Sequence, residues 1–337
     1  MGDKYVLVGL TTGGDSGGSW ADAYQDEADI QTALDALTAG DTLHIASKDD
    51  DDIALSAALD IDQASGTDGN PINWIGYGYN GGSPIADGTR VNLEADTNAL
   101  ANCLTPDNRD DWSLHNLEFS GASSHGIAPK TANHLYRWIF TNCHIHDNDG
   151  DGIGLNGASY FYKARLENCR IYDNGGYGAR LSSSALAGCQ IFNNGGYGVI
   201  GYYLSIADSV IFENTSGGIF DYGNLCVTGT VIDKNTSNGI LVAVGPSIVR
   251  ACRITNNGGY GINISTASVH ASRNFIKDNS SGVSNGASLI TRVGGSADTN
   301  VYTGTIGYID NADTTANADR NYGLTNAATS RRQEVTL

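Results

Sequence analysis

A short pattern recurs from residue 143 to residue 279, and this repeat restricts the fold more than any other feature. Two of its copies are Cys143-His-Ile-His-Asp-Asn148 and Cys169-Arg-Ile-Tyr-Asp-Asn174. In all seven copies an isoleucine stands three positions before the closing asparagine, and in six of them a glycine stands four positions after it. The isoleucines are Ile145, Ile171, Ile191, Ile211, Ile232, Ile254 and Ile276.

Each copy predicts one coil of a β-solenoid. Apolar and variable residues alternate before each asparagine, and this period of two is typical of a half-buried strand. A second short apolar strand follows the glycine, as in residues 239–244. A repeat of roughly 22 residues contains no helical segment, and it is too short for a propeller blade of roughly 40 residues. We therefore predict an all-β parallel β-helix.

Stacked coils turn each repeat position into a column of side chains. The isoleucines then fill the interior, and the asparagines line the bends, where their amides can hydrogen-bond from coil to coil. Asparagine also tolerates the left-handed backbone of a sharp bend. The column cysteines share the inward parity of the isoleucines, so we expect buried, reduced, structural thiols. They are Cys143, Cys169, Cys189 and Cys252, with Cys103 and Cys226 outside the column.

The two ends of the chain lack this repeat. Residues 22–38 carry apolar residues at helical spacing, and an open solenoid end needs a cap, so we expect a capping helix before a first strand at 42–46. After about residue 294 the repeat is lost. We divide the chain into an N-terminal arm (1–19), a capping helix region (20–41), a parallel β-helix (42–293), and a C-terminal cap and tail (294–337).

Charge and composition exclude several classes of protein. The formal net charge is −18, which argues against nucleic acid or anionic membranes as partners. Only 17% of residues are charged and 40% are hydrophobic, so acidic disorder is not expected. No apolar run is long enough for a membrane span. The apolar stretch near the N-terminus is too short for a signal peptide, so we expect that none existed or that it was removed.

The repeat and the segment before it resemble a known superfamily. Residues 30–45, followed by units of the form Asn-Cys-x-Ile-x-x-Asn-x-x-x-Gly-Ile, are similar to the right-handed, single-stranded parallel β-helix of the pectin-lyase-like superfamily over roughly residues 20–290. The end segment 319–326 is similar to that of β-helix proteins from phages and environmental bacteria. The superfamily includes polysaccharide lyases, glycosidases, epimerases, phage tailspikes and adhesins, so the resemblance implies the fold and leaves the activity open.

Three functions follow from this resemblance. The first is a non-catalytic component of a phage particle, such as a fibre, spike or head-decoration protein, whose rigid face binds host glycans, other virion subunits or its own copies as a homotrimer. The second is a polysaccharide lyase or glycoside hydrolase. The third is a secreted bacterial surface protein. We favour the first, with the virion as the location, because phage proteins leave the host by lysis and need no signal peptide.

Histidines and aspartates gather around residues 144–151. The candidate catalytic residues of an enzyme are His146, Asp147, Asp149 and Asp151, because such side chains serve as general acids and bases. The same aspartates resemble the start of a calcium-binding loop, but Ala158 occupies the position of its bidentate Glu. We therefore favour a solvated acidic turn with no cofactor, and surface histidines, over a catalytic or Ca²⁺ site.

Aromatic residues recur at two positions of the repeat. Outward parity two residues before the asparagine predicts an exposed apolar stripe, and such stripes mark interfaces or ligand grooves. For Phe192 and Phe212 we favour a subunit interface. Tyrosines in the glycine-rich bends can stack on sugars or simply fill the bend. The candidate carbohydrate-binding or interface residues are Tyr172, Tyr177, Phe192, Tyr197, Phe212 and Tyr260.

Overall fold

The structure is a computed structural model. It describes residues 2–11, 14–48, 52–80, 83–85, 90–131, 134–154, 160–265, 268–285, 301–303, 306–310 and 332–335. Contacts divide the chain into an N-terminal unit (residues 1–180) and a C-terminal unit (residues 181–337). Each unit is a run of coils in which three short strands belong to three parallel sheets, here called A, B and C.

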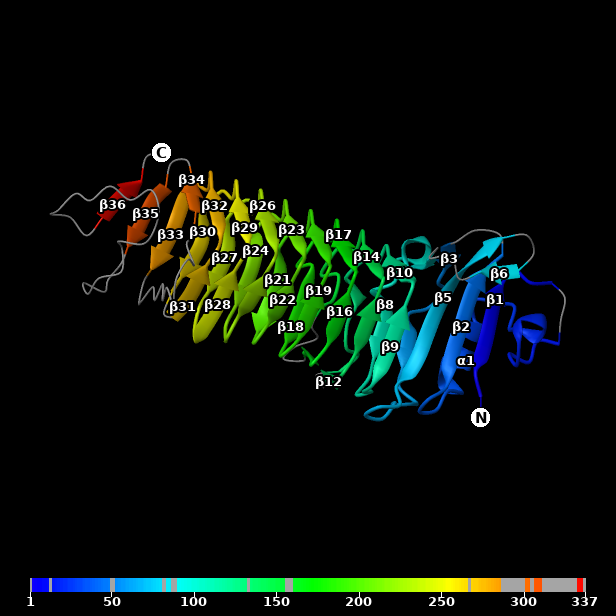
Figure 1. The fold of residues 1–337 in the computed structure, drawn as a ribbon. Helices are drawn as coiled ribbons and strands as arrows, with labels where there is room; N and C mark the ends of the chain where they lie inside the picture. Colours follow the sequence, from blue (N-terminus) through cyan, green and yellow to red (C-terminus); the bar gives the residue numbers. More distant parts are fainter. Residues whose placement is uncertain are drawn as a thin grey trace. The chain divides into compact units, whose positions relative to one another are not determined.

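The coils of the N-terminal unit are drawn in blue to green in Figure 1. Sheet A holds β1 (Lys4–Val8), β2 (Thr42–Ser47), β5 (Ile72–Asn80), β9 (Trp112–His115), β13 (Ile139–Thr141) and β16 (Arg165–Glu167). Sheet B holds β3 (Asp52–Ala54), β7 (Val91–Glu94), β10 (Leu117–Ser120), β14 (His144–His146) and β17 (Arg170–Tyr172). Sheet C is interrupted, with β4 (Leu59–Ile61), β8 (Asn102–Pro106), β11 (His125–Ile127), β12 (Leu135–Tyr136) and β15 (Phe161–Tyr162). β6 (Ser83–Ile85) pairs antiparallel with β5.

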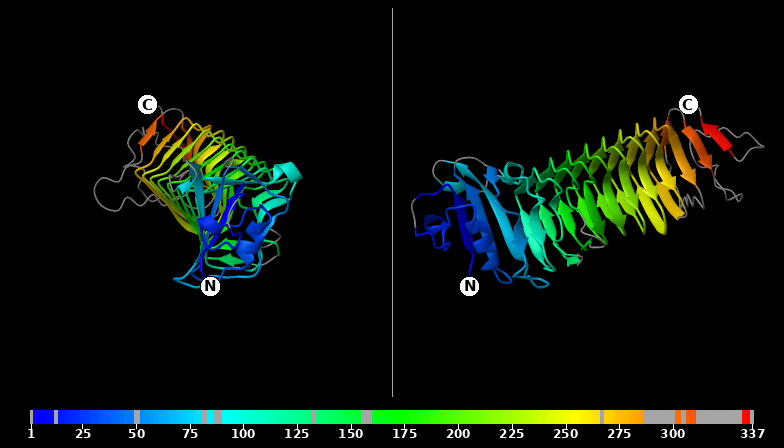
Figure 2. Two further views of the ribbon diagram at one scale, coloured as in Figure 1. Left: turned by 90° about the vertical axis from the view of Figure 1, so that its right-hand side faces the viewer. Right: turned by 180° about the vertical axis from the view of Figure 1, so that it is seen from behind.

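The C-terminal unit is more regular, and Figure 2 shows its strands repeating coil after coil. Sheet A holds β19 (Ala185–Ala187), β22 (Ser205–Ala207), β25 (Cys226–Thr228), β28 (Pro246–Arg250) and β31 (Ser268–Ser272). Sheet B holds β20 (Gln190–Phe192), β23 (Val210–Phe212), β26 (Val231–Asp233), β29 (Arg253–Thr255), β32 (Phe275–Lys277) and β34 (Val301–Thr303). Sheet C holds β21 (Tyr197–Tyr202), β24 (Gly217–Asp221), β27 (Asn238–Val242), β30 (Tyr260–Ile264), β33 (Ser281–Asn285), β35 (Ile306–Asp310) and β36 (Arg332–Val335). β18 (Ala179–Ser182) lies at the division between the units.

The interior columns predicted from the repeat are confirmed. All seven repeat isoleucines are at most 1% exposed, and they pair in register within each unit, as Ile145 does with Ile171 and Ile211 with Ile232. The four column cysteines are buried beside them, and all six cysteines are free. Burial raises the pKa of Cys103 to about 12 and that of Cys252 to about 11. These two thiols therefore stay protonated and act as small apolar side chains.

The asparagine column is also confirmed, but its role in the bend differs from the expectation. Asn214 is fully buried, and its amide donates to Asn235 Oδ1 at 3.0 Å and to the carbonyl of Ile191 at 3.2 Å. The left-handed residue is the one before each column asparagine, for example Glu213 with φ 55°. The asparagine turns inward and satisfies buried backbone groups, so its amide matters more than its tolerance of positive φ.

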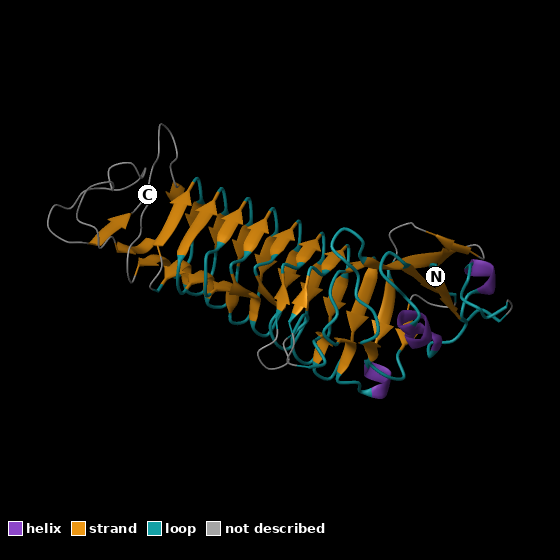
Figure 3. Cartoon of the chain, turned by 90° about the horizontal axis from the view of Figure 1, so that it is seen from below, coloured by secondary structure: helices purple, strands orange, loops and turns teal. Residues whose placement is uncertain are grey.

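The first coils differ from the sequence-based expectation. Helix α1 spans Asp29–Asp35, shorter than the predicted 22–38, and it is preceded by the 3-10 helix η1 (Trp20–Asp22). Strand β1, in the expected arm, pairs in parallel with β2, so sheet A begins before residue 42. A third short helix, η2, spans Asp96–Asn98, and all three appear in purple in Figure 3. No helix of the described residues is long and apolar enough to cross a membrane.

Parallel pairing continues past residue 293, the expected end of the β-helix. β34 pairs in parallel with β32, and β35 pairs with β33. The last pair, β35 and β36, is antiparallel. Most of the predicted C-terminal cap (294–337), including the segment 319–326, lies outside the described residues.

Candidate functional site

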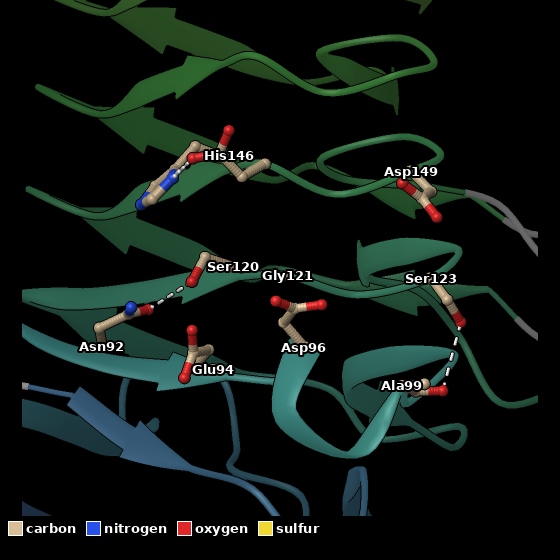
Figure 4. A pocket seen from close by; sticks show the side chains of 10 residues that line it. Asn92, Glu94, Asp96, Ala99, Ser120, Gly121, Ser123, His146 and Asp149 are labelled. Atoms are coloured by element: carbon tan, nitrogen blue, oxygen red, sulfur yellow. Dashed lines mark hydrogen bonds and ion pairs between the residues drawn. The ribbon is translucent and has the colours of Figure 1, made fainter.

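A polar pocket of about 490 Å³ opens on sheet B of the N-terminal unit (Figure 4). It is lined by Asn92, Glu94, Asp96, Ala99, Ser120, Gly121, Ser123, His146, Asp147 and Asp149. Three of the four candidate catalytic residues, His146, Asp147 and Asp149, therefore belong to one pocket. Its other acidic side chains come from strand β7 and helix η2.

The register of sheet B aligns the pocket side chains. Glu94 pairs with Ser120, and Ser120 pairs with His146, so these residues form one column on the outer face. A period of two puts Asn92 on the same face of β7 as Glu94, and its Oδ1 accepts a hydrogen bond from Ser120 Oγ at 3.0 Å. Because parallel strands place equivalent residues about 4.8 Å apart, the column forms a polar wall.

Helix η2 lines the pocket next to this column. It follows β7 directly and carries Asp96, and the Asn98 amide donates to the carbonyl of Leu55 at 2.6 Å, which anchors the turn. Gly121 has φ +74°, and a Cβ there would lie 2.7 Å from Asp96 Cβ. Glycine is therefore required at this position for the close approach of η2 to the bend after β10.

His146 is held between two carboxylates. Its Nδ1 lies 2.6 Å from Asp147 Oδ2, and its Nε2 lies 2.6 Å from Glu118 Oε1. The imidazole also stacks on the Tyr172 ring, with 4.6 Å between the ring centres and 7° between the planes. Glu118 Oε2 lies 3.3 Å from His144 Nδ1. Both nitrogens of His146 face acceptors, an arrangement that favours the imidazolium form.

The pKa values of these groups follow from burial and pairing. Burial lowers the pKa of His146, but its hydrogen bonds to Glu118 and Asp147 outweigh burial and raise the pKa. Burial alone raises the pKa of Glu118, but hydrogen bonds to His144 and His146 lower it to about 2. Burial lowers the pKa of His144, which the Glu118 contact opposes. Glu118 therefore stays ionised near neutral pH, and His146 is its cationic partner.

The open part of the pocket is acidic. Asp96, Asp147 and Asp149 are exposed, and Glu94 is half-buried. No Lys or Arg lies among the lining residues of the described chain. Carboxylates and amides are strong acceptors and donors for hydroxyl groups. The pocket can therefore hold polyhydroxylated or cationic groups, whereas its charge repels anions.

The fourth candidate, Asp151, lies outside this pocket. Its carboxylate is buried and accepts the backbone N–H of Tyr177 at 2.7 Å, while its Oδ2 lies 2.7 Å from Arg180 Nε. Its backbone N–H donates to His125 Nδ1 at 3.0 Å. Asp151 is thus a connection between neighbouring bends. The alternating aspartates separate because strand β14 ends at His146, and the turn that follows points Asp149 outward and Asp151 inward.

The predicted aromatic candidates fall into two groups by unit. In the N-terminal unit, Tyr172 covers His146, and the Tyr177 ring lies 4.2 Å from the Arg180 guanidinium. In the C-terminal unit, Phe192 and Phe212 are half-buried and stack with 4.8 Å between ring centres. There Tyr197 lies 5.3 Å from Phe220, and the Tyr260 backbone N–H donates to Asn238 Oδ1. None of these aromatic residues lines the pocket.

Among the described residues, no three His, Cys, Asp or Glu side chains are placed so that they could share a metal ion. Asp147 Oδ2 contacts His146, and Asp151 contacts Arg180. Two of the three aspartates that resemble a calcium loop, Asp147 and Asp151, therefore use carboxylate oxygens for protein contacts.

Sequence reasoning missed Asn92, Glu94, Asp96 and Glu118. A signal for Glu118 existed, because Glu118-Phe-Ser120 precedes His144-Ile-His146 by one coil, and the two strands pair in register. Extending the repeat one coil upstream would have found it. Glu94 and Asp96 carry no repeat signal, because β7 follows a long insertion after β5 and η2 departs from the repeat.

Comparison with known proteins agrees with the fold. A family model described as a right-handed beta helix region matches residues 102–243. Pectate lyase Pel9A is similar at 16% identity and a TM-score of 0.57, with 89% of this chain covering 79% of that one. XylC, solved with xylose, is similar at 11% identity and a TM-score of 0.56, with coverage of 84% and 70%. No curated protein matches the chain by sequence.

A phage protein shares the fold as well. Tailspike protein 2 from Escherichia coli O157:H7 bacteriophage CAB120 is similar at 13% identity and a TM-score of 0.51, and 82% of this chain covers 36% of that one. At these identities the likeness concerns architecture alone. The chain therefore has the right-handed parallel β-helix fold.

Proposed function

We propose that the protein is a glycan-binding β-helix protein whose site is the acidic pocket on sheet B of the N-terminal unit. The observation that carries the proposal is the convergence of Asn92, Glu94 and Asp149 with the clamped His146 around one open pocket of about 490 Å³. A few convergent polar groups in a concavity of this size are typical of small-ligand sites. Sugar hydroxyls match this set, since carboxylates accept from hydroxyl groups and the Asn92 amide can donate to them.

The charge of the pocket selects among glycans. Four carboxylates line it without a lining Lys or Arg in the described chain. A polyuronate would meet like charge there, which costs binding free energy. Neutral glycans and glycans with free amino groups suit the pocket. A lyase acting on uronates is therefore less well supported by this surface than a protein that binds neutral or amino sugars.

The test is binding to a panel of neutral, amino-sugar and uronate oligosaccharides by calorimetry. The double variant Glu94→Gln, Asp149→Asn should lose at least about tenfold in affinity for the bound class, as expected when charged hydrogen bonds of roughly 1.5–3 kcal/mol are weakened. Asp173→Asn is the matched control, because Asp173 occupies the repeat position of Asp147 one coil further and lies outside the pocket. Preferential binding of uronates, or unchanged binding by the double variant, would contradict the proposal.

Glycoside hydrolysis is the second candidate, and the grouping of Glu94, Asp96 and Asp149 around one pocket favours it. Glycosidases use two carboxyl groups on either side of the scissile bond. The assay is release of reducing ends from any glycan that binds. Turnover that disappears in Asp149→Asn while binding persists would establish an enzyme, and binding without turnover would support a non-catalytic role.

We further infer that the protein is a structural or adhesion component of a phage particle. The β-helix fold, which it shares with a phage tailspike, and the likeness of its end segment to phage β-helix proteins support this location. Labelling of intact phage particles with antibodies against the chain, viewed by electron microscopy, tests it. Label on bacterial surfaces in uninfected cultures would instead support a secreted surface protein.

A further inference from the structure

The sequence repeat did not predict an aromatic surface that lies on the C-terminal unit. Tyr202 and Tyr222 occupy neighbouring coils of sheet C and stack with 5.1 Å between ring centres and 26° between planes. Phe220 lies 4.2 Å from Tyr222. Both tyrosines are more than a third exposed, and Tyr203, next in the chain, is 55% exposed. These four residues are here called the aromatic platform.

Tyr203 is unusual for its place in the coil. In four coils of the described residues, the residue two positions before the sheet A strand has positive φ. These residues are Arg137, Lys163, Ser183 and Tyr203. Tyr203 has φ 56°. A bulky aromatic residue is rare in this left-handed conformation, which is sterically strained. The polar or flexible residues of the other coils satisfy the bend, so the fold itself does not require an exposed tyrosine here.

Two residues of the next coil support the bend that carries Tyr203. Asp221 is fully buried, and its carboxylate accepts the backbone N–H groups of Leu204 at 3.1 Å and Gly223 at 2.6 Å. A Cβ at Gly223 would lie 3.2 Å from Tyr203 Cδ1, so the ring rests against the glycine backbone. The tyrosine is thus held in place by its surroundings, as expected of a binding residue.

The same coil position carries stacked tyrosines in the N-terminal unit. Tyr136 and Tyr162 pair in register, and their ring centres are 5.4 Å apart at an interplanar angle of 25°. Like Tyr202, each directly precedes the left-handed bend residue. Both are half-buried. Rings therefore recur at one position of the coil, and those of the C-terminal unit are the more exposed.

We propose that the aromatic platform is a second glycan-binding site, which takes neutral sugar rings by stacking on Tyr202, Tyr203 and Tyr222. The inference extends the proposed function, since it assigns another sugar site on a different unit. Because Tyr202 and Tyr222 stack on each other, a pyranose can contact the ring surfaces turned away from this pair, and the phenol hydroxyls can hydrogen-bond to its edge. Successive coils repeat about every 4.8 Å, a spacing close to the length of one sugar residue in an extended glycan.

Other occupants fit this surface less well. Three tyrosines exposed by 36–55% present roughly 300 Å² of ring surface at most, given about 150–250 Å² per aromatic side chain. A stable protein interface needs about 800 Å² from each partner. Stacked nucleobases would bring phosphates toward a chain of net charge −18, which repels them. A neutral glycan requires neither a large area nor cationic partners.

The test uses the double variant Tyr202→Ser, Tyr203→Ser. The preceding coil carries Ser182 and Ser183 at these positions, so the variant copies a bend that the fold already accepts. Ile248→Ser, which removes a 45% exposed apolar side chain on strand β28 of sheet A, is the matched control. Cellohexaose, xylohexaose and chitohexaose are the probes, with saturation-transfer NMR and calorimetry as readouts and sedimentation velocity to monitor assembly.

We expect wild-type protein to bind at least one probe and the double variant to lose at least tenfold in affinity. Ile248→Ser should bind like the wild type, and the sedimentation coefficient should stay unchanged. The pocket variant Glu94→Gln, Asp149→Asn separates the two sites. If it retains probe binding that the tyrosine variant loses, the platform stands even where the pocket proposal fails. Wild-type protein that binds no probe, a double variant that binds normally, or one that changes only the assembly state would overturn the inference.

Discussion

The two units use the same coil in different ways. In sheet B of the N-terminal unit, Glu118, His144 and Arg170 are equivalent residues of successive coils. In the C-terminal unit the equivalent residues follow one another at shorter intervals, and they are Gln190, Val210, Val231, Arg253 and Phe275. The longer coils carry the additional turns and charged side chains, and the pocket lies there. The shorter coils carry an unbroken asparagine column.

This difference indicates how a solenoid divides stability and function. In the short coils nearly every position is set by stacking on its neighbours, because each repeat contacts only the next. In the long coils, an insertion such as η2 changes one surface without changing the interior columns. The residues that depart from the repeat are therefore the first to examine for function.

The largest effect should come from breaking the asparagine column of the C-terminal unit. Asn214→Ala removes the acceptor of the Asn194 backbone N–H at 3.2 Å and the donor to the Ile191 carbonyl. Several buried groups lose partners at once, and each costs about 1–3 kcal/mol. We expect a loss of about 3–5 kcal/mol in the free energy of unfolding, measured by urea denaturation.

The comparison variant is Glu213→Ala, at the exposed left-handed position before Asn214. We expect it to cost less than about 1 kcal/mol, because alanine carries the same Cβ at this positive φ and the variant loses only an exposed ion pair with Lys234. Equal losses for the two variants would contradict a structural role for the buried amide.

The second effect concerns the His146 clamp of the N-terminal unit. The pKa of Glu118 is depressed to about 2, so its stabilising contribution is present above about pH 4.5 and is lost as the pH falls. The pKa of His146 is raised above 6.5, so its contribution is present below that pH and is lost as the pH rises through the raised pKa. The clamp should therefore stabilise the unit most between about pH 4.5 and 6.5.

Glu118→Gln tests this clamp directly. Removal of the carboxylate should lower the pKa of His146 by about one unit or more, since a neighbouring opposite charge shifts a pKa by roughly 1–3 units. The readout is the imidazole Cε1–H chemical shift during a pH titration. His44, on strand β2 of sheet A, serves as the internal control, and its titration midpoint should not move. An unchanged His146 midpoint would show that the ion pair does not persist in solution.

The smallest effect on the stability of the chain should come from the aromatic stripe of the C-terminal unit. A stacked pair such as Phe192 and Phe212 contributes about 0.5–1.5 kcal/mol beyond its buried area. If these rings form a subunit interface, Phe192→Asp with Phe212→Asp should convert an oligomer, proposed to be a trimer, into soluble monomers. Sedimentation equilibrium measures the change, and an unaltered assembly would end the interface hypothesis.

The sequence predicted most of the repeating architecture and part of the site. The stacking of coils determines the residue types at positions such as Ile211 and Asn214. This stacking produces a repeat that is visible in a single sequence. Glu94 and Asp96 reach the pocket through an insertion whose path depends on tertiary contacts, such as the approach of η2 to Gly121. Asp151 turned inward because Arg180 and His125 of other coils hold it, and no local pattern reports such partners.

The asparagine column of the C-terminal unit has a direction. From Asn194 to Asn279 every hydrogen bond between two side-chain amides of the column runs from an Nδ2 donor to the Oδ1 of the asparagine with the higher residue number. Every coil of this run therefore offers an asparagine Oδ1 acceptor to the preceding coil and an asparagine Nδ2 donor to the following coil. Duplication or deletion of a whole coil therefore leaves matched ends, whereas a partial coil does not. The length of such a protein can therefore change in evolution by one whole coil at a time.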